Sequence, residues 1–244
     1  MPAPALTLER IYPPHLDADN QNDRETLRIH LERYDFAATR LIGTRVLDMA
    51  CGCGYGSARL AELNPDKTVV GVDIDPAAIA FAQLHYQRPN LRYHCADAES
   101  FSIEEGFDNI VCLETIEHLP RPQRLIANCA ALLAEGGQII ASVPITPTLD
   151  GNRHHLHDFS VRSFLALFQP HALHPAERFE QIQWWQFKGL FSRNATRQHR
   201  SEGVGNAVLA YYRQHPLYLL QRLASMLRYG FSNRYLTCRF RTAR

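Results

Sequence analysis

A glycine-rich turn between an apolar run and a predicted helix constrains the fold of this chain more than any other feature. The turn occupies residues 51–56, follows an apolar run at 46–48 and leads into a helix expected at about 57–63. Glycine lets the main chain turn sharply and lets a ligand approach it closely. A strand, such a turn and a helix in this order indicate a nucleotide-like ligand at the carboxyl edge of a sheet.

Strand and helix patterns alternate along the chain on both sides of that turn. Apolar and β-branched runs predict strands at 44–48, 68–73, 91–95, 107–113 and 138–143. Helices are predicted at 24–41, 57–63, 77–87 and 122–134. Farther along we expect a helix at 160–168, a strand at 179–187, two helical stretches within 206–228 and a last strand at 235–240.

This alternation is typical of βαβ units with right-handed crossovers and a parallel sheet. We therefore expect an α/β fold: a doubly wound, Rossmann-like sheet of about seven strands, mostly parallel with an antiparallel last strand, and helices on both faces. The expected parts of this domain are an N-terminal lid or helix segment (1–43), a cofactor-binding core (44–145) and a substrate-side C-terminal part (146–244).

Composition places the chain among ordinary globular proteins, with 244 residues, 45% of them hydrophobic and 21% charged. No run of 18 apolar residues occurs, so no membrane span is expected. The first ten residues lack a basic stretch followed by an apolar core, so no secretory signal is expected. Six cysteines are too few for a disulfide scaffold, which favours a cytoplasmic protein.

Charge is distributed unevenly along the chain. Residues 178–244 hold twelve Lys or Arg and two acids, a net charge of +10, whereas residues 1–177 hold fourteen and twenty-three, a net charge of −9. This asymmetry suggests an anionic partner for the C-terminal third. The stretch 217–231 is apolar and basic, so a peripheral contact with the inner face of an anionic membrane is one hypothesis. A solvated surface and RNA are the open alternatives.

The turn itself narrows the choice of ligand. Gly54 is not followed by the Lys of a P-loop, and the glycine spacing fits a dinucleotide fingerprint poorly. Asp48 stands at the end of the first strand, where a carboxylate would repel a pyrophosphate and attract a cation. These residues favour a cofactor without phosphate that carries positive charge. S-adenosylmethionine has an ammonium group and a sulfonium group.

The stretch VLDMACGCGYG at 46–56 resembles motif I of class I S-adenosylmethionine-dependent methyltransferases, with Ala50 where the usual form has glycine. The later motifs VVGVDID, HCADAES, FDNIV and LAEGG follow in the same order, and the resemblance covers about residues 24–145. It implies that Asp73 binds the ribose hydroxyls, Ile74 lies beside the adenine and Asp97 reads the adenine edge. The full set of implied cofactor-binding residues is Asp48, Ala50, Gly52, Gly54, Asp73, Ile74, Asp97, Ala98 and Glu114.

Carboxylates and histidines cluster after the fourth predicted strand. Glu114, Glu117 and His118 are spaced i, i+3 and i+4, so they share one face if a helical turn begins there. Ubiquinone-pathway O-methyltransferases carry a similar E-x-x-E-H. Small-RNA 3′-end 2′-O-methyltransferases add a later His before a Phe, which His157 matches. These four residues could bind Mg²⁺ or another divalent cation. Alternatively, His118 and Glu117 are catalytic without metal, and His118 orients or deprotonates the acceptor.

The resemblance implies a methyltransferase, and we expect O-methylation of a small-molecule, sugar or lipid-linked glycan hydroxyl. The helix at 30–37 and the stretch HHLHDFS are similar to methyltransferases encoded with polysaccharide and glycolipid assembly enzymes. Arg33 and Tyr34 of that helix are candidates to contact the methionine carboxylate of the cofactor. The alternatives are an RNA 2′-O-methyltransferase and a non-catalytic cofactor-binding module.

Overall fold

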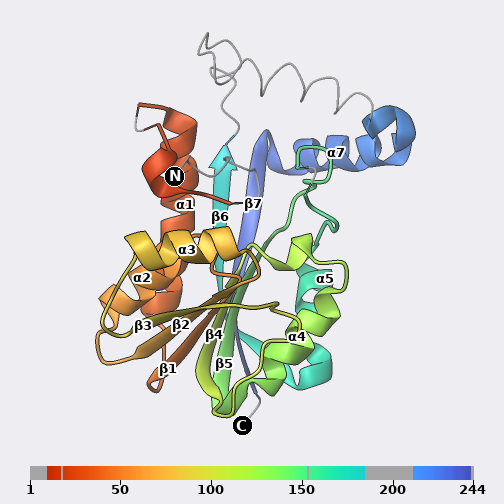
Figure 1. Cartoon of the computed structure of the whole chain (residues 1–244). Coiled ribbons are helices and arrows are strands. Elements are labelled where there is room, and N and C mark those ends of the chain that lie inside the picture. The colour runs from red at the N-terminus through yellow and green to blue at the C-terminus, as the bar shows by residue number, and fades with distance from the viewer. Residues whose placement is uncertain (1–9, 18, 153, 185–210, 243–244) are drawn as a thin grey trace.

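A single seven-stranded sheet organises the computed structural model, which describes residues 10–17, 19–152, 154–184 and 211–242. The strand order is β3-β2-β1-β4-β5-β7-β6 (Figure 1). The strands β1 to β5 pair in parallel, whereas β7 is antiparallel to both of its neighbours. The expected mixed α/β sheet with a reversed last strand is confirmed. The strands are β1 (Arg45–Met49), β2 (Thr68–Asp73), β3 (Leu91–Cys95), β4 (Phe107–Leu113), β5 (Leu133–Pro144), β6 (Leu173–Trp184) and β7 (Ser232–Thr242).

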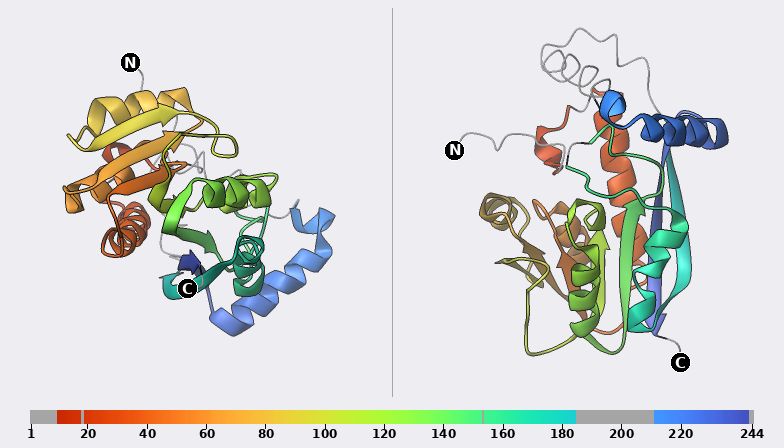
Figure 2. Two further views of the ribbon diagram at one scale, coloured as in Figure 1. Left: turned by 90° about the horizontal axis from the view of Figure 1, so that it is seen from below. Right: turned by 90° about the vertical axis from the view of Figure 1, so that its right-hand side faces the viewer.

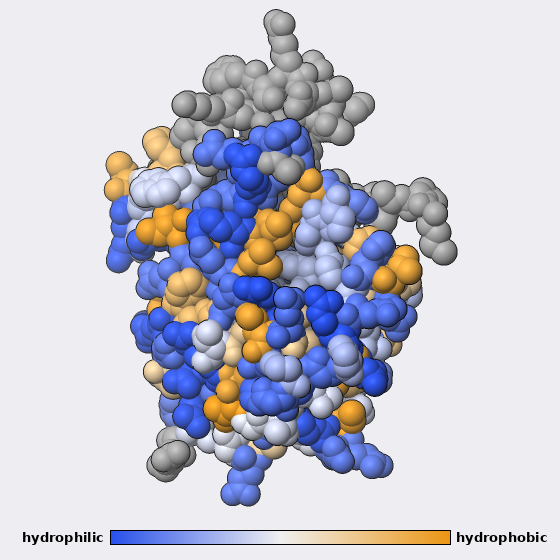
Figure 3. Space-filling model, turned by 90° about the vertical axis from the view of Figure 1, so that its left-hand side faces the viewer, coloured by the Kyte–Doolittle hydropathy of each residue, from blue (hydrophilic) through white to orange (hydrophobic). Residues whose placement is uncertain are grey.

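Helices cover both faces of this sheet. The helices α1, α2 and α3 lie on one side and α4 and α5 on the other, while α7 lies beyond the sheet near one end of β7 (Figures 1 and 2). The side that carries α1 and α2 has polar and apolar residues interspersed on its surface (Figure 3). The helical segments are η1 (Pro13–His15), α1 (Gln21–Ala38), α2 (Tyr55–Leu63), α3 (Pro76–His85), η2 (Ile116–His118), α4 (Pro122–Ala131), α5 (Val161–Ala166), η3 (Gln169–His171) and α7 (Pro216–Tyr229).

The core divides into two clusters because neighbouring strand residues point to opposite faces of the sheet. Leu47 and Ile139 belong to the cluster under α4 and α5, which includes Phe164. Their neighbours Val46 and Ile140 belong to the cluster under α1 and α2. All five side chains are fully buried. Central strands buried on both faces explain the nearly continuous apolar runs in the sequence.

The clearest departure from the sequence prediction concerns the turn after α4. The helix ends at Ala131, and β5 begins at Leu133 and runs through the glycine pair that was expected to separate helix from strand. The Phe107 amide donates to the Leu132 carbonyl at 2.8 Å, and Phe107 pairs with Leu133. Pairing with β4 therefore outweighs the usual tendency of glycine to interrupt a strand.

Smaller departures lie at element ends and in the C-terminal third. The first helix begins at Gln21 rather than at residue 24, and α5 ends at Ala166 rather than at 168. Residues 185–187 of the expected sixth strand, and 206–210 of the expected penultimate helix, lie outside the described residues. Within the described ranges, no helix has the length and apolar character that crossing a bilayer requires.

Candidate functional site

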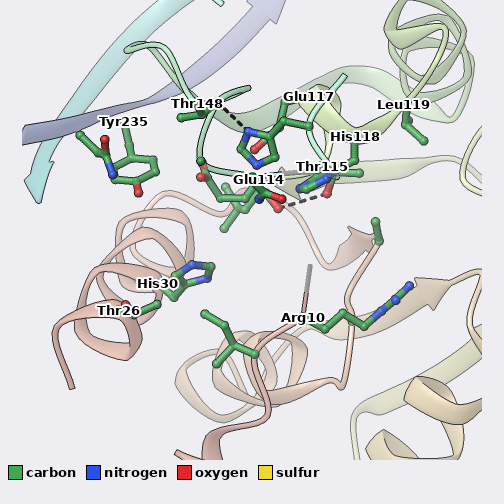
Figure 4. Close-up of a pocket in the computed structure, with 18 of the residues that line it drawn as sticks. Arg10, Thr26, His30, Glu114, Thr115, Glu117, His118, Leu119, Thr148 and Tyr235 are labelled. Atoms are coloured by element: carbon green, nitrogen blue, oxygen red, sulfur yellow. Dashed lines mark hydrogen bonds between the residues drawn. The ribbon is translucent and has the colours of Figure 1, made fainter. Parts of the chain in front are cut away.

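A cavity of about 850 Å³ opens at the carboxyl ends of the central strands. Its walls come from the turn after β1, the ends of β2 and β4, helix α1 and helix α7. Figure 4 shows Glu114, Thr115, Glu117 and His118 opposite Thr26 and His30 of α1. Most of the sequence-predicted site residues line this cavity: Ala50, Gly52, Asp73, Ile74, Asp97, Ala98, Glu114, Glu117 and His118.

Asp73 holds the glycine-rich turn through hydrogen bonds to backbone amides. One carboxylate oxygen accepts the Gly52 amide at 2.9 Å, and the other accepts the Asp75 amide at the same distance. Asp75 in turn caps α3 by accepting the Ala77 amide. Ala50 has φ +62°, a left-handed conformation in which glycine is favoured. The turn thus keeps the glycine-type backbone although this chain has alanine there.

Two predicted cofactor residues, Asp48 and Gly54, lie behind the cavity rather than among its lining residues in the described part of the chain. Asp48 is 1% exposed and accepts the Ser57 hydroxyl at 2.5 Å, with the Tyr34 hydroxyl at 3.4 Å. Burial raises the pKa of Asp48 to about 7, and the hydrogen bonds from Ser57 and Tyr34 oppose that rise. A Cβ at Gly54 would lie 2.5 Å from the Ala82 Cβ. Both residues therefore position the turn.

The segment before α1 reaches the same site. Arg10 donates from Nη2 to Asp73 Oδ1 at 3.0 Å, and the Cys53 thiol donates to the Ile11 carbonyl. Arg10 and Ile11 both line the cavity, and Figure 4 shows the Arg10 side chain beside it. This contact could not be predicted from the sequence, because it joins residues far apart in the chain without a recognisable motif.

Arg33 of α1 is a buried cation facing the cavity. It is 1% exposed, donates from Nε to Gln181 Oε1 at 2.9 Å and lies 4.5 Å above the centre of the Tyr235 ring. Its Nη1 atom is 3.7 Å from Glu114 Oε2, too far for a hydrogen bond. Neither terminal nitrogen has a hydrogen-bond partner among the described residues. Such a guanidinium suits an anionic group bound in the cavity.

The predicted Glu–His cluster divides in the structure. Glu114 has φ +51°, and its carboxylate accepts the Ser142 hydroxyl at 2.7 Å and faces Arg33. The helical turn starts only at Ile116, so Glu114 does not share a helical face with Glu117 and His118. Glu117, His118 and His155 instead offer ligand atoms that all lie within 4.8 Å of one another.

Glu117 is the buried carboxylate of this trio. It is 0% exposed, and neither oxygen has a hydrogen-bond partner among the described residues. Burial raises the pKa of Glu117 well above its ordinary value, and the nearby charge of Glu114 adds to the effect. A buried carboxylate without a hydrogen-bond partner, close to two imidazoles, can bind a cation or share a proton with them.

The two histidines are oriented by their other ring nitrogens. His118 Nδ1 is 3.1 Å from the His154 carbonyl, and His155 Nδ1 is 2.6 Å from the Thr148 hydroxyl oxygen. A carbonyl can only accept, so His118 carries its proton on Nδ1, which makes Nε2 the acceptor nitrogen of the ring. Burial, with the charges of His118 and His154, lowers the pKa of His155 to about 3, so its imidazole is neutral.

His157, the fourth predicted metal ligand, points elsewhere. Its Nε2 donates to the Leu119 carbonyl at 2.9 Å, and it is not among the described residues that line the cavity. In an extended stretch, His155 and His157 would point the same way. The Leu156 and His157 amides instead both bond the Glu117 carbonyl, which curls the segment around η2. His155 therefore lies where His157 was expected.

Comparisons with known proteins match the central part of the chain to methyltransferases. Residues 46–137 match the family model described as a methyltransferase domain. A ubiquinone biosynthesis O-methyltransferase of Coxiella burnetii is 35% identical over 158 residues, covering 62% of this chain and 64% of that protein. Another from Aromatoleum aromaticum is 38% identical over 106 residues, covering 42% of this chain and 44% of that protein. The matched part spans less than two thirds of either relative.

Solved structures extend the similarity to the fold of nearly the whole chain. The N-methyltransferase NodS of Bradyrhizobium japonicum WM9, solved with S-adenosyl-L-homocysteine, superposes with a TM-score of 0.57 at 19% identity, covering 93% of this chain and 90% of NodS. The [4+2]-cyclase SpnF superposes with a TM-score of 0.59 at 16% identity, covering 91% and 82%. At these identities the similarity shows the fold alone.

Proposed function

We propose that the chain transfers the methyl group of S-adenosylmethionine to a small-molecule hydroxyl, a proposal supported by the match of residues 46–137 to a methyltransferase domain. The observation that carries the proposal is one cavity that joins the glycine-rich turn and Asp73 to the Glu117, His118 and His155 trio. A donor at the turn and an acceptor at the trio would therefore share one enclosed space. SpnF, a cyclase with this fold, is the reason that fold alone does not carry the proposal.

The cofactor end of the cavity offers a group for each part of S-adenosylmethionine. We assign the ribose hydroxyls to Asp73, the adenine face to Ile74, whose side chain is 61% exposed, and the adenine edge to Asp97 and Ala98. Arg33, whose two buried terminal nitrogens have no hydrogen-bond partner among the described residues, suits the methionine carboxylate. Asp48 and Gly54 act on the cofactor indirectly, by holding the turn.

The acceptor end supplies a base. In the transfer, a bond forms between the acceptor oxygen and the methyl carbon while the bond from that carbon to sulfur breaks. The hydroxyl proton passes to the Nε2 lone pair of His118, whose ring is fixed by the His154 carbonyl. The imidazolium that forms favours the ionised form of Glu117, whose ligand atom lies within 4.8 Å of that of His118, and the carboxylate in turn stabilises the imidazolium.

The same trio fits a divalent cation. Two imidazoles and one carboxylate, with Glu117 unpaired and fully buried, form a donor set typical of Mn²⁺, Fe²⁺ or Zn²⁺. Glu117, His118 and His155 would hold it, in place of the predicted set with Glu114 and His157. A bound cation would lower the pKa of an acceptor hydroxyl.

The proposed class of acceptor is supported by the relatives and by the sequence. The relatives' printed function, O-methylation in ubiquinone biosynthesis, favours an oxygen nucleophile on a small molecule. A sugar or lipid-linked glycan hydroxyl remains the more specific proposal from the sequence.

The test is methyl transfer from isotope-labelled S-adenosylmethionine to fractionated cell extract, sorted into lipid, quinone, glycan, RNA and protein pools. We expect label in a small-molecule pool with the wild type and at least tenfold less with His118→Ala, since a positioned base typically contributes about 10²–10⁴-fold. Calorimetry with S-adenosylhomocysteine confirms that the variant still binds cofactor. Cofactor binding by the wild type without labelling of any pool would favour the non-catalytic module.

A further inference from the structure

One side of helix α7 is held by polar contacts, and the other side is exposed to solvent. Its inner side is anchored: the Arg222 Nε donates to Asp150 Oδ2 at 2.7 Å, and the Tyr218 hydroxyl accepts the Leu149 amide at 3.1 Å and donates to Asp158. Arg222 and Tyr218 are 7% and 9% exposed. Polar contacts therefore fix this helix over the mouth of the cavity, with its rotation about its own axis determined.

That rotation leaves a row of leucines facing solvent. Leu217, Leu220 and Leu227 are 75%, 61% and 90% exposed. They recur at spacings of three and seven residues, which places them on one side of the helix. Since Arg222 and Tyr218 are held on the opposite side, the exposed row cannot be buried by turning the helix. An ordinary surface helix would expose polar side chains there.

The apolar row is continuous with the wall of the cavity. Leu219, Leu223 and Met226 of the same helix line the cavity, and Leu223 is also 47% exposed. At 100° per residue, the side chains from Met226 through Leu223 to Leu220 occupy one unbroken arc. An apolar surface thus runs from the cavity mouth to the outside of α7.

Two aromatic side chains extend the row beyond the end of the helix. Phe231 is 49% exposed, and Trp184, at the end of β6, is 62% exposed. A Cβ at Gly230 would lie 3.5 Å from the Trp184 ring, so the indole adjoins the helix end. Tryptophan is enriched where proteins meet the headgroup region of a bilayer.

The part of the chain that carries this row is basic. No Asp or Glu occurs after Glu202 in the chain. Arg222 is paired with Asp150, whereas Arg228 near the end of the same helix and Arg213 before its start are exposed. A partner that fits must therefore be apolar where it meets the leucines and anionic around them.

We propose that α7, with Trp184 and Phe231, docks the protein on the surface of an anionic phospholipid bilayer. The helix has 14 residues, about 21 Å in length, and its apolar arc and basic flank are those of a helix lying in the plane of the interface. This orientation directs the mouth of the cavity toward the lipid. The docking surface does not depend on which reaction the cavity performs.

The test is flotation of the full-length protein with vesicles of phosphatidylcholine alone or mixed with phosphatidylglycerol. We expect the wild type to float with the mixed vesicles at low salt. The triple variant Leu217→Gln, Leu220→Gln, Leu227→Gln should bind at least about tenfold more weakly. Arg228→Gln should weaken binding to the mixed vesicles about fivefold and leave binding to phosphatidylcholine unchanged.

A matched control separates this surface from exposed leucine in general. Leu84→Gln changes a leucine that is 72% exposed on α3, and it should float as the wild type does. Unchanged binding of S-adenosylhomocysteine by the triple variant shows that it is folded. The proposal is wrong if the wild type stays unbound to mixed vesicles, or if the triple variant floats equally well. It is also wrong if the triple substitution instead dissociates a dimer in sedimentation experiments.

Discussion

At the residue scale, the site depends on charges that the fold buries. Asp73, Arg33 and Glu117 are 4%, 1% and 0% exposed, yet each lines the cavity. Burying a charge is costly unless a partner compensates it. Asp73 has backbone amides and Arg10 as partners, whereas the other two have unsatisfied atoms in the described structure. A ligand that supplies the missing partners would recover that cost on binding.

Asp73→Ala should weaken the binding of S-adenosylmethionine by roughly 1.5–3 kcal/mol, about 10- to 150-fold, because hydrogen bonds to a charged group are lost. Calorimetry measures the change. Asp66→Ala, an exposed acid at the opposite end of β2, is the control and should leave the affinity unchanged. An unchanged affinity for Asp73→Ala would remove the assignment of the ribose to this residue.

Arg33→Met should weaken binding of S-adenosylhomocysteine by roughly 1.5–3 kcal/mol while binding of 5′-methylthioadenosine stays the same. The first ligand has the amino-acid carboxylate and the second lacks it. Equal losses for both ligands would show that the substitution distorts the site rather than removing an anion partner. Arg28→Met, which changes a half-exposed arginine on the same helix, is the control.

At the scale of elements, the turn η2 and the segment around His155 build the acceptor end together. The Leu156 amide donates to the Glu117 carbonyl at 2.8 Å, and the ring centroids of His118 and His155 are 4.6 Å apart. Two segments separated by more than thirty residues thus act as one element. This pairing predicts that His155, rather than His157, contributes to the acceptor end of the site.

If the trio binds a divalent cation, exhaustive treatment with chelator should abolish methyl transfer, and Mn²⁺ or Mg²⁺ should restore it. His155→Ala should lower metal affinity at least tenfold, as loss of a ligand does, whereas His157→Ala should not. Metal content after dialysis and activity are measured together. Full activity in chelator would leave His118 acting as a base without metal, and equal effects of the two alanine variants would contradict the placement of His155.

At the scale of the whole molecule, the buried carboxylate of Asp48 in the central strand β1 links stability to pH. Burial raises the pKa of Asp48 from 3.8 to about 7, so the folded state binds this proton more tightly than the unfolded state. The free energy of unfolding should therefore fall as the pH rises from about 4 to about 7, by at most about 4 kcal/mol from this group. Above that range its contribution is constant.

Asp48→Asn should remove that part of the pH dependence, since an amide does not ionise. Urea denaturation of both proteins at several pH values measures the free energy of unfolding. As the pH rises from 4 to 7, the free energy of unfolding of the variant should increase relative to that of the wild type. Asp108→Asn, at a partly buried carboxylate on β4 that accepts the Thr44 and Arg45 amides, controls for general charge effects. A constant difference between wild type and Asp48→Asn over this range would show that Asp48 is ionised throughout.

The sequence alone determined the parts of this protein that depend on local pattern. Strand runs and the glycine-rich turn predicted the sheet, its reversed last strand and the position of Asp73 at the carboxyl edge. Such features follow from periodicity and from the conformational freedom of glycine, which act over a few residues. The methyltransferase resemblance depended on the same stretch, which is also the part that the family model matches.

The tertiary structure decided what joins distant segments. It placed His155 rather than His157 beside Glu117, turned Asp48 away from the cavity and brought Arg10 onto Asp73. It also neutralised part of the basic C-terminal third, by pairing Arg222 with Asp150 and Arg239 with Glu177. None of these contacts has a spacing that a sequence can show, because each depends on how a loop curls or a helix docks once the core is packed.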